Sequence, residues 1–231
     1  MLPQYVRQPA KLKRLVVTCD YDFSNFARFA FPHVTHLTQL TTLEIQAEAW
    51  TAYPHAELIR YNLSRCPETL QHVILDGLYL ARLDGHQSEI QQVLGSALAS
   101  LTCLELKHCR LSLAGRSMSC LAHLQSLSFQ GSQVWGDACH ITTLTSLTLL
   151  DLSGSVWNQP HHHDSIHNDW RIPVMIAFTA WSALEVLKLS YCSLFDGRTG
   201  LHLPSVVDLQ LHWLPPSIGS STLRICRHDC F

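Results

Sequence analysis

LTCLELKHC at residues 101–109 is the stretch that decides the fold, because it returns as LTLLDLSGS at residues 147–155 and as LEVLKLSYC at residues 184–192. Each copy is a short phrase with apolar residues at its first, fourth and sixth positions. A strand of this length cannot bury its own apolar side chains, so neighbouring copies have to stack side by side. The repeat therefore predicts a solenoid.

The phrase occurs along nearly the whole chain, at uneven intervals of 22 to 37 residues. Its fourth and sixth positions are apolar in every copy, which predicts strands whose inward side chains form one continuous core. The eleventh position is apolar in phrases two to seven and assigns Trp50 and Trp157 to that core. We expect a single domain over residues 1–231. Its eight phrases begin at Leu12, Leu40, Leu70, Leu101, Leu124, Leu147, Leu184 and Val206.

The pattern L-x-x-L-x-L-x-x-(N or C)-x-L resembles that of the leucine-rich-repeat family, and the resemblance covers about residues 12–216. The short phrases look most like ribonuclease-inhibitor-like repeats and those of plants and green algae. The resemblance implies an α/β leucine-rich-repeat solenoid of about eight repeats, with a curved parallel sheet on the concave side and a role in binding other proteins. On the convex side we expect helices over residues 54–66 and 88–101, and shorter segments after residue 105.

The ninth phrase position is where the family motif needs a side chain that reaches backbone groups of the turn. Cys109 and Cys192 occupy it in two phrases, and Ser132 and Ser155 occupy it in two others. Five other cysteines are predicted to be buried thiols that pack as small apolar residues: Cys19, Cys66, Cys103, Cys120 and Cys139.

Composition excludes several functions. Sixteen Lys and Arg against 18 Asp and Glu give a net charge of -2, which leaves no basic surface for nucleic acid or an anionic membrane. The sequence contains no hydrolase, nucleotide-binding or kinase motif, so we expect no enzymatic activity and no cofactor. The N-terminal residues have no apolar run typical of a signal peptide, which favours a cytoplasmic protein; association with the cytoskeleton or a cilium is the alternative.

The concave face carries the predicted binding residues. Phrase positions three, five and seven point outward. Position eight has large aromatic residues only in the last two phrases, at Tyr191 and Trp213, which we interpret as anchors for a protein or peptide partner. The alternative is a solvated sheet face, with Asp76–Lys107 and Asp151–Lys188 as ion pairs and Trp213 as a cap over the core. The predicted partner-binding residues are Trp213, Tyr191, His212, Asp151, Lys188, Gln210, Glu105 and Lys107.

An insertion at residues 158–171 breaks the repeat, and it contains His161, His163 and His167. Imidazoles at this spacing are candidate ligands for a transition metal. A solvated histidine tract is the simpler interpretation, so no metal site is predicted there. Residues 226–230 (CRHDC) offer two thiols and an imidazole as weak candidates for zinc, and a frayed tail is the simpler interpretation.

Three functions remain open. The first is a protein-interaction scaffold that uses the concave face and the C-terminal rim. The second is the substrate-recognition part of a larger adaptor, such as a ubiquitin-ligase receptor or a cytoskeletal assembly factor, because neither end of the repeat array has a polar cap. The third is a metal-binding module on the loop of residues 161–169. The identity of the partner and the oligomeric state stay open.

Overall fold

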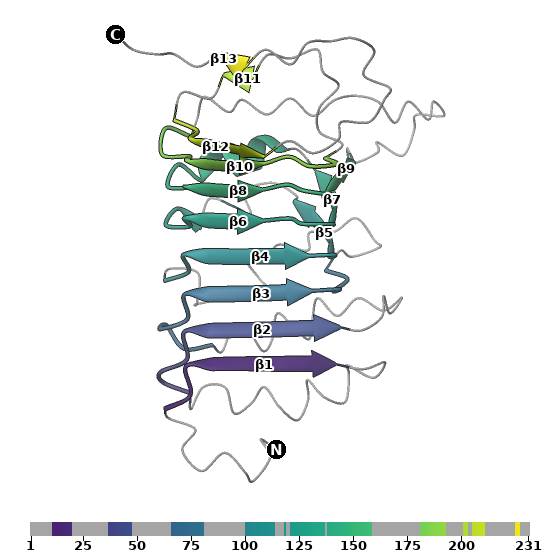
Figure 1. Cartoon of the computed structure of the whole chain (residues 1–231). Coiled ribbons are helices and arrows are strands. Elements are labelled where there is room, and N and C mark those ends of the chain that lie inside the picture. The colour runs from purple at the N-terminus through teal and green to yellow at the C-terminus, as the bar shows by residue number, and fades with distance from the viewer. Residues whose placement is uncertain are drawn as a thin grey trace.

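The main element is a sheet of eight parallel strands that follow one another in chain order (Figure 1). The computed structural model describes residues 11–19, 37–47, 66–80, 100–113, 118, 121–136, 138–158, 181–192, 201–202, 205–210 and 225–226. One strand coincides with each of the eight phrases. The strands are β1 (Arg14–Cys19), β2 (Thr42–Ala47), β3 (His72–Asp76), β4 (Cys103–Lys107), β6 (Ser126–Ser128), β8 (Leu149–Asp151), β10 (Val186–Lys188) and β12 (Asp208–Gln210).

Neighbouring strands pair at equal phrase positions. Leu43 of β2 lies opposite Leu15 of β1 and Val73 of β3, and the same alignment continues to β12. Because side chains alternate along a strand, this register places every fourth and sixth position on one face. The repeat in the sequence thus becomes a continuous apolar stripe in space.

The core lies behind that face. The first, fourth and sixth positions of β2, β4, β6, β8 and β10 are at most 1% exposed. A tight turn precedes these strands, as where the Leu40 N–H donates to the Leu37 carbonyl at 2.9 Å. The residue that begins this turn is also buried in several repeats; the largest is Trp181, 1% exposed, which the phrase pattern did not identify.

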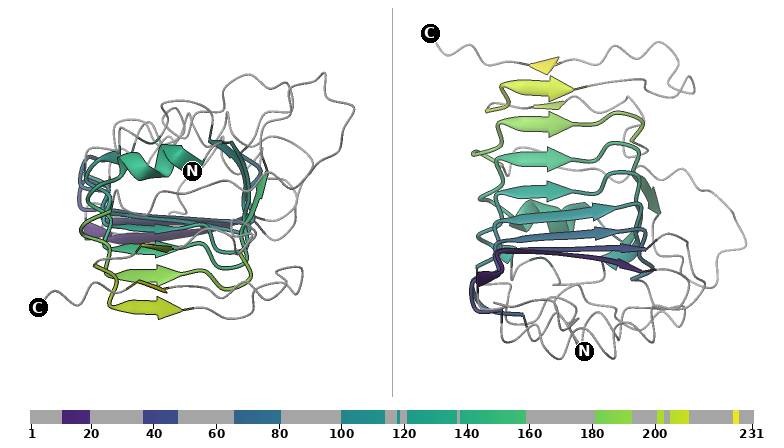
Figure 2. Two further views of the ribbon diagram at one scale, coloured as in Figure 1. Left: turned by 90° about the horizontal axis from the view of Figure 1, so that it is seen from above. Right: turned by 60° about the horizontal axis from the view of Figure 1, so that its bottom comes forward.

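A second, three-stranded sheet stands at the carboxyl ends of the main strands (Figure 2, left). It consists of β5 (Arg110–Leu113), β7 (Gln133–Gly136) and β9 (Val156–Asn158). It carries phrase position eleven, and Leu111, Val134 and Trp157 are buried there, as predicted. The Trp157 ring meets Phe129 edge to face, with 5.4 Å between ring centroids. Trp50 lies outside the described residues.

A ladder of small polar side chains runs through the core at position nine. The Ser132 hydroxyl donates to the Leu106 carbonyl at 2.6 Å and accepts from the Cys109 N–H at 2.9 Å. The Cys109 thiol lies 3.2 Å from the Leu75 carbonyl. These contacts confirm the predicted role, because they satisfy backbone groups that are buried between repeats.

The same ladder continues at Ser155. Its hydroxyl donates to the Leu152 carbonyl at 2.6 Å and accepts from the Trp157 indole at 3.0 Å. The Cys192 sulfur lies 3.4 Å from that hydroxyl. Serine and cysteine therefore perform one structural task in successive repeats.

The remaining described elements are short. A 3-10 helix, η5 (Ala138–Thr143), lies across the molecule from the main sheet (Figure 2, left). Near the C-terminus β11 (Leu201–His202) pairs with β13 (Ile225–Cys226) in a separate parallel sheet. β13 does not extend the main sheet. Across the residues that the structure describes, no helix is both long and apolar enough to span a bilayer.

These features together are those of a leucine-rich-repeat solenoid, which confirms the predicted fold class. The helices predicted over residues 54–66 and 88–101 and the insertion at 158–171 lie almost wholly outside the described residues.

Candidate functional site

The outward side of the eight-stranded sheet is the candidate site. We call the side chains at phrase positions three, five and seven the open face. On β4, Leu104 and Leu106 are fully buried, whereas Cys103, Glu105 and Lys107 are half-buried on the open face. This alternation is the predicted one.

The N-terminal part of the open face is held by a buried carboxylate. Arg14 contacts the Glu44 carboxylate at 2.8 Å, and the Gln46 amide donates to it at 2.5 Å. The hydrogen bond from Arg14 lowers the pKa of Glu44, and burial opposes this effect without reversing it. Glu44 is therefore an ionised group whose partners are internal.

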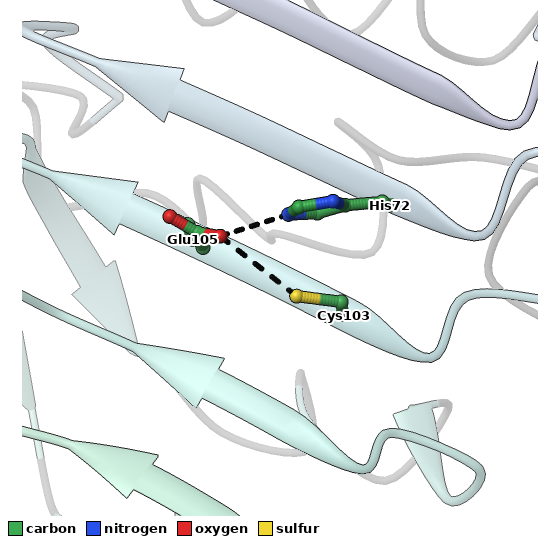
Figure 3. Close-up of side chains that lie close together, drawn as sticks. All are labelled: His72, Cys103 and Glu105. Atoms are coloured by element: carbon green, nitrogen blue, oxygen red, sulfur yellow. Dashed lines mark hydrogen bonds and ion pairs between the residues drawn. The ribbon is translucent and has the colours of Figure 1, made fainter. Parts of the chain in front are cut away.

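A denser cluster lies on β3 and β4 (Figure 3). The His72 Nε2 atom is 2.9 Å from Oε1 of Glu105, and the Lys107 ammonium is 2.6 Å from Oε2. The Cys103 thiol lies 4.0 Å from Oε1. Burial raises the pKa of Glu105, but the bonds from Lys107 and His72 outweigh it and hold that pKa below its usual value. Burial raises the pKa of the Cys103 thiol.

Both predicted cross-strand ion pairs are wrong. The register does place Asp76 opposite Lys107, but Lys107 bonds instead to Glu105 on its own strand. Asp76 is bound by the His108 imidazole at 2.9 Å, because His108 turns back toward it at the end of β4.

Asp151 likewise lies opposite Lys188, yet among the described residues no ion pair joins the two. The Asp151 carboxylate accepts from the backbone N–H of Ser153 at 2.9 Å instead. At the next strand, the Gln210 amide donates to the exposed Asp208 carboxylate at 2.9 Å. Within the described part of the chain, the C-terminal charges are thus not neutralised by ion pairs, in contrast to those on β1 to β4.

Position eight forms the edge of the open face and has an unusual backbone. Its φ angle is positive at Gly77, Gly131 and Gly154, where glycine adopts the left-handed conformation without steric cost. His108 (φ 49°) and Tyr191 (φ 57°) adopt it with full side chains. The three glycines at this position therefore have a backbone cause, and His108 and Tyr191 adopt the same conformation at a conformational cost. Tyr191 is also 62% exposed.

The structure collects most of the predicted partner-binding residues on one surface. Glu105, Lys107, Asp151, Lys188 and Gln210 lie on the open face, and Tyr191 lies at its edge. The others, Trp213 and His212, lie outside the described residues, as do His161, His163 and His167.

Sequence reasoning missed His72 and assigned Cys103 wrongly. Cys103 was predicted to pack in the core, but it stands at outward position three, directly opposite His72. The phrase register alone could have placed both on the open face. Cys66 fits the prediction: it is buried, and burial raises the pKa of its thiol to about 12.

The sequence matches no family model. No curated protein matches it either. Among solved structures, an internalin of Listeria monocytogenes is 16% identical over 82% of this chain and 48% of its own, with a TM-score of 0.48. Internalin C2 of the same organism is 15% identical over 88% and 82%, with a TM-score of 0.46.

A leucine-rich-repeat protein of Leptospira interrogans is 19% identical over 91% of this chain and 53% of its own, with a TM-score of 0.46. The chain thus spans about half the length of the first and third of these proteins. At these TM-scores the fold assignment rests on the repeat geometry described above.

Proposed function

We propose that this chain is a non-enzymatic protein-interaction scaffold of the cytoplasm, and that a protein or peptide partner binds the C-terminal half of the open face. Asp151, Lys188 and Gln210 contact the partner, with Tyr191 as the anchor at the edge. The proposal extends to Trp213 and His212, which follow Gln210 in the sequence. The surface has no basic character that favours nucleic acid or an anionic membrane.

The contrast between the two halves of the open face carries this proposal. On β1 to β4, bonds within the protein already engage the carboxylates of Glu44 and Glu105. A partner would have to compete with those internal bonds to use the charges. Among the described residues, no ion pair has to be broken to reach Asp151 or Lys188.

Tyr191 adds an anchor to that surface. Tyrosine is enriched among the residues that dominate binding energy at interfaces, because a rigid ring offers a large contact area at small entropic cost. At 62% exposure it retains most of its surface for a partner.

The adaptor alternative keeps the same binding surface but assigns it to a larger polypeptide, a ubiquitin-ligase receptor or a cytoskeletal assembly factor. The short phrases, with their resemblance to ribonuclease-inhibitor-like, plant and green-algal repeats, favour a role near the cytoskeleton or a cilium in this alternative. An antibody against the open face would then detect a native polypeptide well above 26.1 kDa. Detection at 26.1 kDa alone would remove the adaptor alternative.

Co-purification with a triple variant tests the scaffold. Asp151→Asn keeps an acceptor for the Ser153 N–H, Lys188→Gln removes the charge, and Tyr191→Gly suits the positive φ, so the fold should be preserved. Proteins that the wild-type chain retains from native extract should be lost from this variant.

Val16→Ala is the matched control. Val16 lies on the same sheet at its opposite end and is 47% exposed, so the variant removes exposed apolar surface without touching the proposed site. Wild type and Val16→Ala should retain the same proteins. Retention of that set by the triple variant as well would exclude the C-terminal half of the open face as the binding surface.

A further inference from the structure

The cluster on β3 and β4 contains three chemically different metal donors. Register pairs His72 directly with Cys103, and Glu105 follows two residues later on the same face of β4 (Figure 3). A donor atom of the imidazole, the thiol and the carboxylate all lie within 4.8 Å of one another. These donors come from two hydrogen-bonded strands, so their backbones are fixed relative to each other.

We propose that His72, Cys103 and Glu105 form a zinc-binding site, with a water molecule as the fourth ligand. Imidazole nitrogen, thiolate sulfur and carboxylate oxygen are the ligands that zinc takes in proteins. The thiolate excludes magnesium and calcium, which require oxygen ligands. Three protein ligands and one water is the composition of an open zinc site.

The distances fit a tetrahedral ion after small side-chain movements. With zinc bond lengths of about 2.0–2.3 Å, ligand atoms lie roughly 3.2–3.8 Å apart. The His72 nitrogen is now 2.9 Å, and the Cys103 sulfur 4.0 Å, from Oε1 of Glu105. Each donor therefore has to shift by about 1 Å or less, which side-chain rotation provides without a change in the strands.

Lys107 positions the carboxylate for this role. Its ammonium holds Oε2 of Glu105 at 2.6 Å, which leaves Oε1 directed toward His72 and Cys103. Groups that hold a metal ligand from behind fix its orientation in this way. On binding, zinc replaces the thiol proton of Cys103, which is released to solvent.

The fourth position faces outward. The side chains of His72 and Glu105 remain 31% and 23% exposed, so solvent reaches the cluster. A water molecule can complete the coordination in the isolated protein. The site therefore does not depend on the proposed protein partner.

Titration of the isolated chain with Zn²⁺ and Co²⁺ tests the site. The background variant carries His161→Gln, His162→Gln, His163→Gln, His167→Gln, Cys226→Ser and Cys230→Ser, which removes the other candidate imidazole and thiol ligands. We expect one Zn²⁺ per chain with a dissociation constant below about 1 µM at neutral pH. Co²⁺ should give a sulfur-to-cobalt charge-transfer band together with the visible bands of four-coordinate cobalt.

Cys103→Ser should abolish the charge-transfer band. His72→Gln and Glu105→Gln should weaken binding by more than the roughly 10- to 100-fold typical of groups that only support a ligand. Circular dichroism of each variant checks folding. If a ligand variant does not fold, the zinc titration of the background protein still tests the site. Absence of stoichiometric zinc binding to that protein, or a charge-transfer band that persists in Cys103→Ser, overturns the proposal. The co-purification experiment with the triple variant of Asp151, Lys188 and Tyr191 tests the protein-binding proposal, and its result does not bear on the zinc site.

Discussion

Replacement of Ser132 by alanine tests the ladder that joins the repeats. Ser132 is fully buried, and its hydroxyl serves two backbone groups at once: the Leu106 carbonyl at 2.6 Å and the Cys109 N–H at 2.9 Å. Ser132→Ala leaves both without this partner. A buried polar group without a partner costs roughly 1–3 kcal/mol, so we expect the free energy of unfolding to fall by about 3 kcal/mol.

Thermal and urea unfolding followed by circular dichroism measure this loss. For a chain of this length each 1 kcal/mol lowers Tm by about 2–4 °C, so Ser132→Ala should unfold about 6–12 °C below wild type. An unchanged urea m-value would show that the same surface is exposed on unfolding. Ser132→Cys should lose much less stability, because cysteine occupies the same phrase position in two other repeats of this chain, at Cys109 and Cys192.

Ser153→Ala is the matched control on the open face. Ser153 is half-buried, and its contact with Asp151 is made by the backbone N–H, which alanine retains. The free energy of unfolding should change by no more than about 0.5 kcal/mol. If Ser132→Ala unfolded within about 1 °C of Ser153→Ala, the ladder hydroxyl would not be what satisfies the buried groups between repeats.

Three further predictions concern the open face and its edge. Tyr191→Gly should leave Tm within a few degrees of wild type or raise it, because relief of roughly 1–2 kcal/mol of left-handed strain offsets the entropy of glycine. Gly131→Ala should destabilise the fold by at least about 1–2 kcal/mol, because its φ is +65° and a Cβ would lie 2.6 Å from the His108 ring. In the double variant with His108→Gly, only the share of that stability loss that comes from contact with the ring should be restored. Arg14→Gln should cost less than about 1 kcal/mol at pH 7. The pKa of Glu44 is lowered from 4.5 in the folded protein. The difference in unfolding free energy between wild type and Arg14→Gln, measured by urea titration, should therefore be fully present above pH 4.5 and vanish as the pH falls through the pKa of Glu44 in the folded protein.

The sheet and its core could be predicted because the same side-chain positions face the core in every repeat. Placing Leu104 in the core fixes Leu106 there too, and the parallel register carries that choice to every strand. In four repeats the same logic extends to position nine, where small side chains such as Ser132 satisfy buried backbone groups, whereas the third phrase has the buried Leu78 there.

The contacts on the open face could not be predicted in the same way. Register places Asp76 opposite Lys107, but a long side chain can reach both that position and Glu105, two residues before it on the same face. Which carboxylate Lys107 binds depends on side-chain rotamers and on a third residue. His108 binds Asp76 at the end of β4, where the backbone of His108 is left-handed. Phrase spacing contains no signal for that turn beyond the glycines of other repeats.

Two repeats of the described chain have a large side chain at position eight. Both His108 and Tyr191 accept the left-handed backbone that glycine takes in three other repeats. His108 recovers part of that cost within the protein, through its 2.9 Å contact with Asp76 and its packing over Gly131. Tyr191 is 62% exposed, so burial of its ring contributes little to the stability of the chain alone. In the partner site that we propose, Tyr191 is the anchor because its large ring is mostly exposed at an edge where three other repeats have glycine.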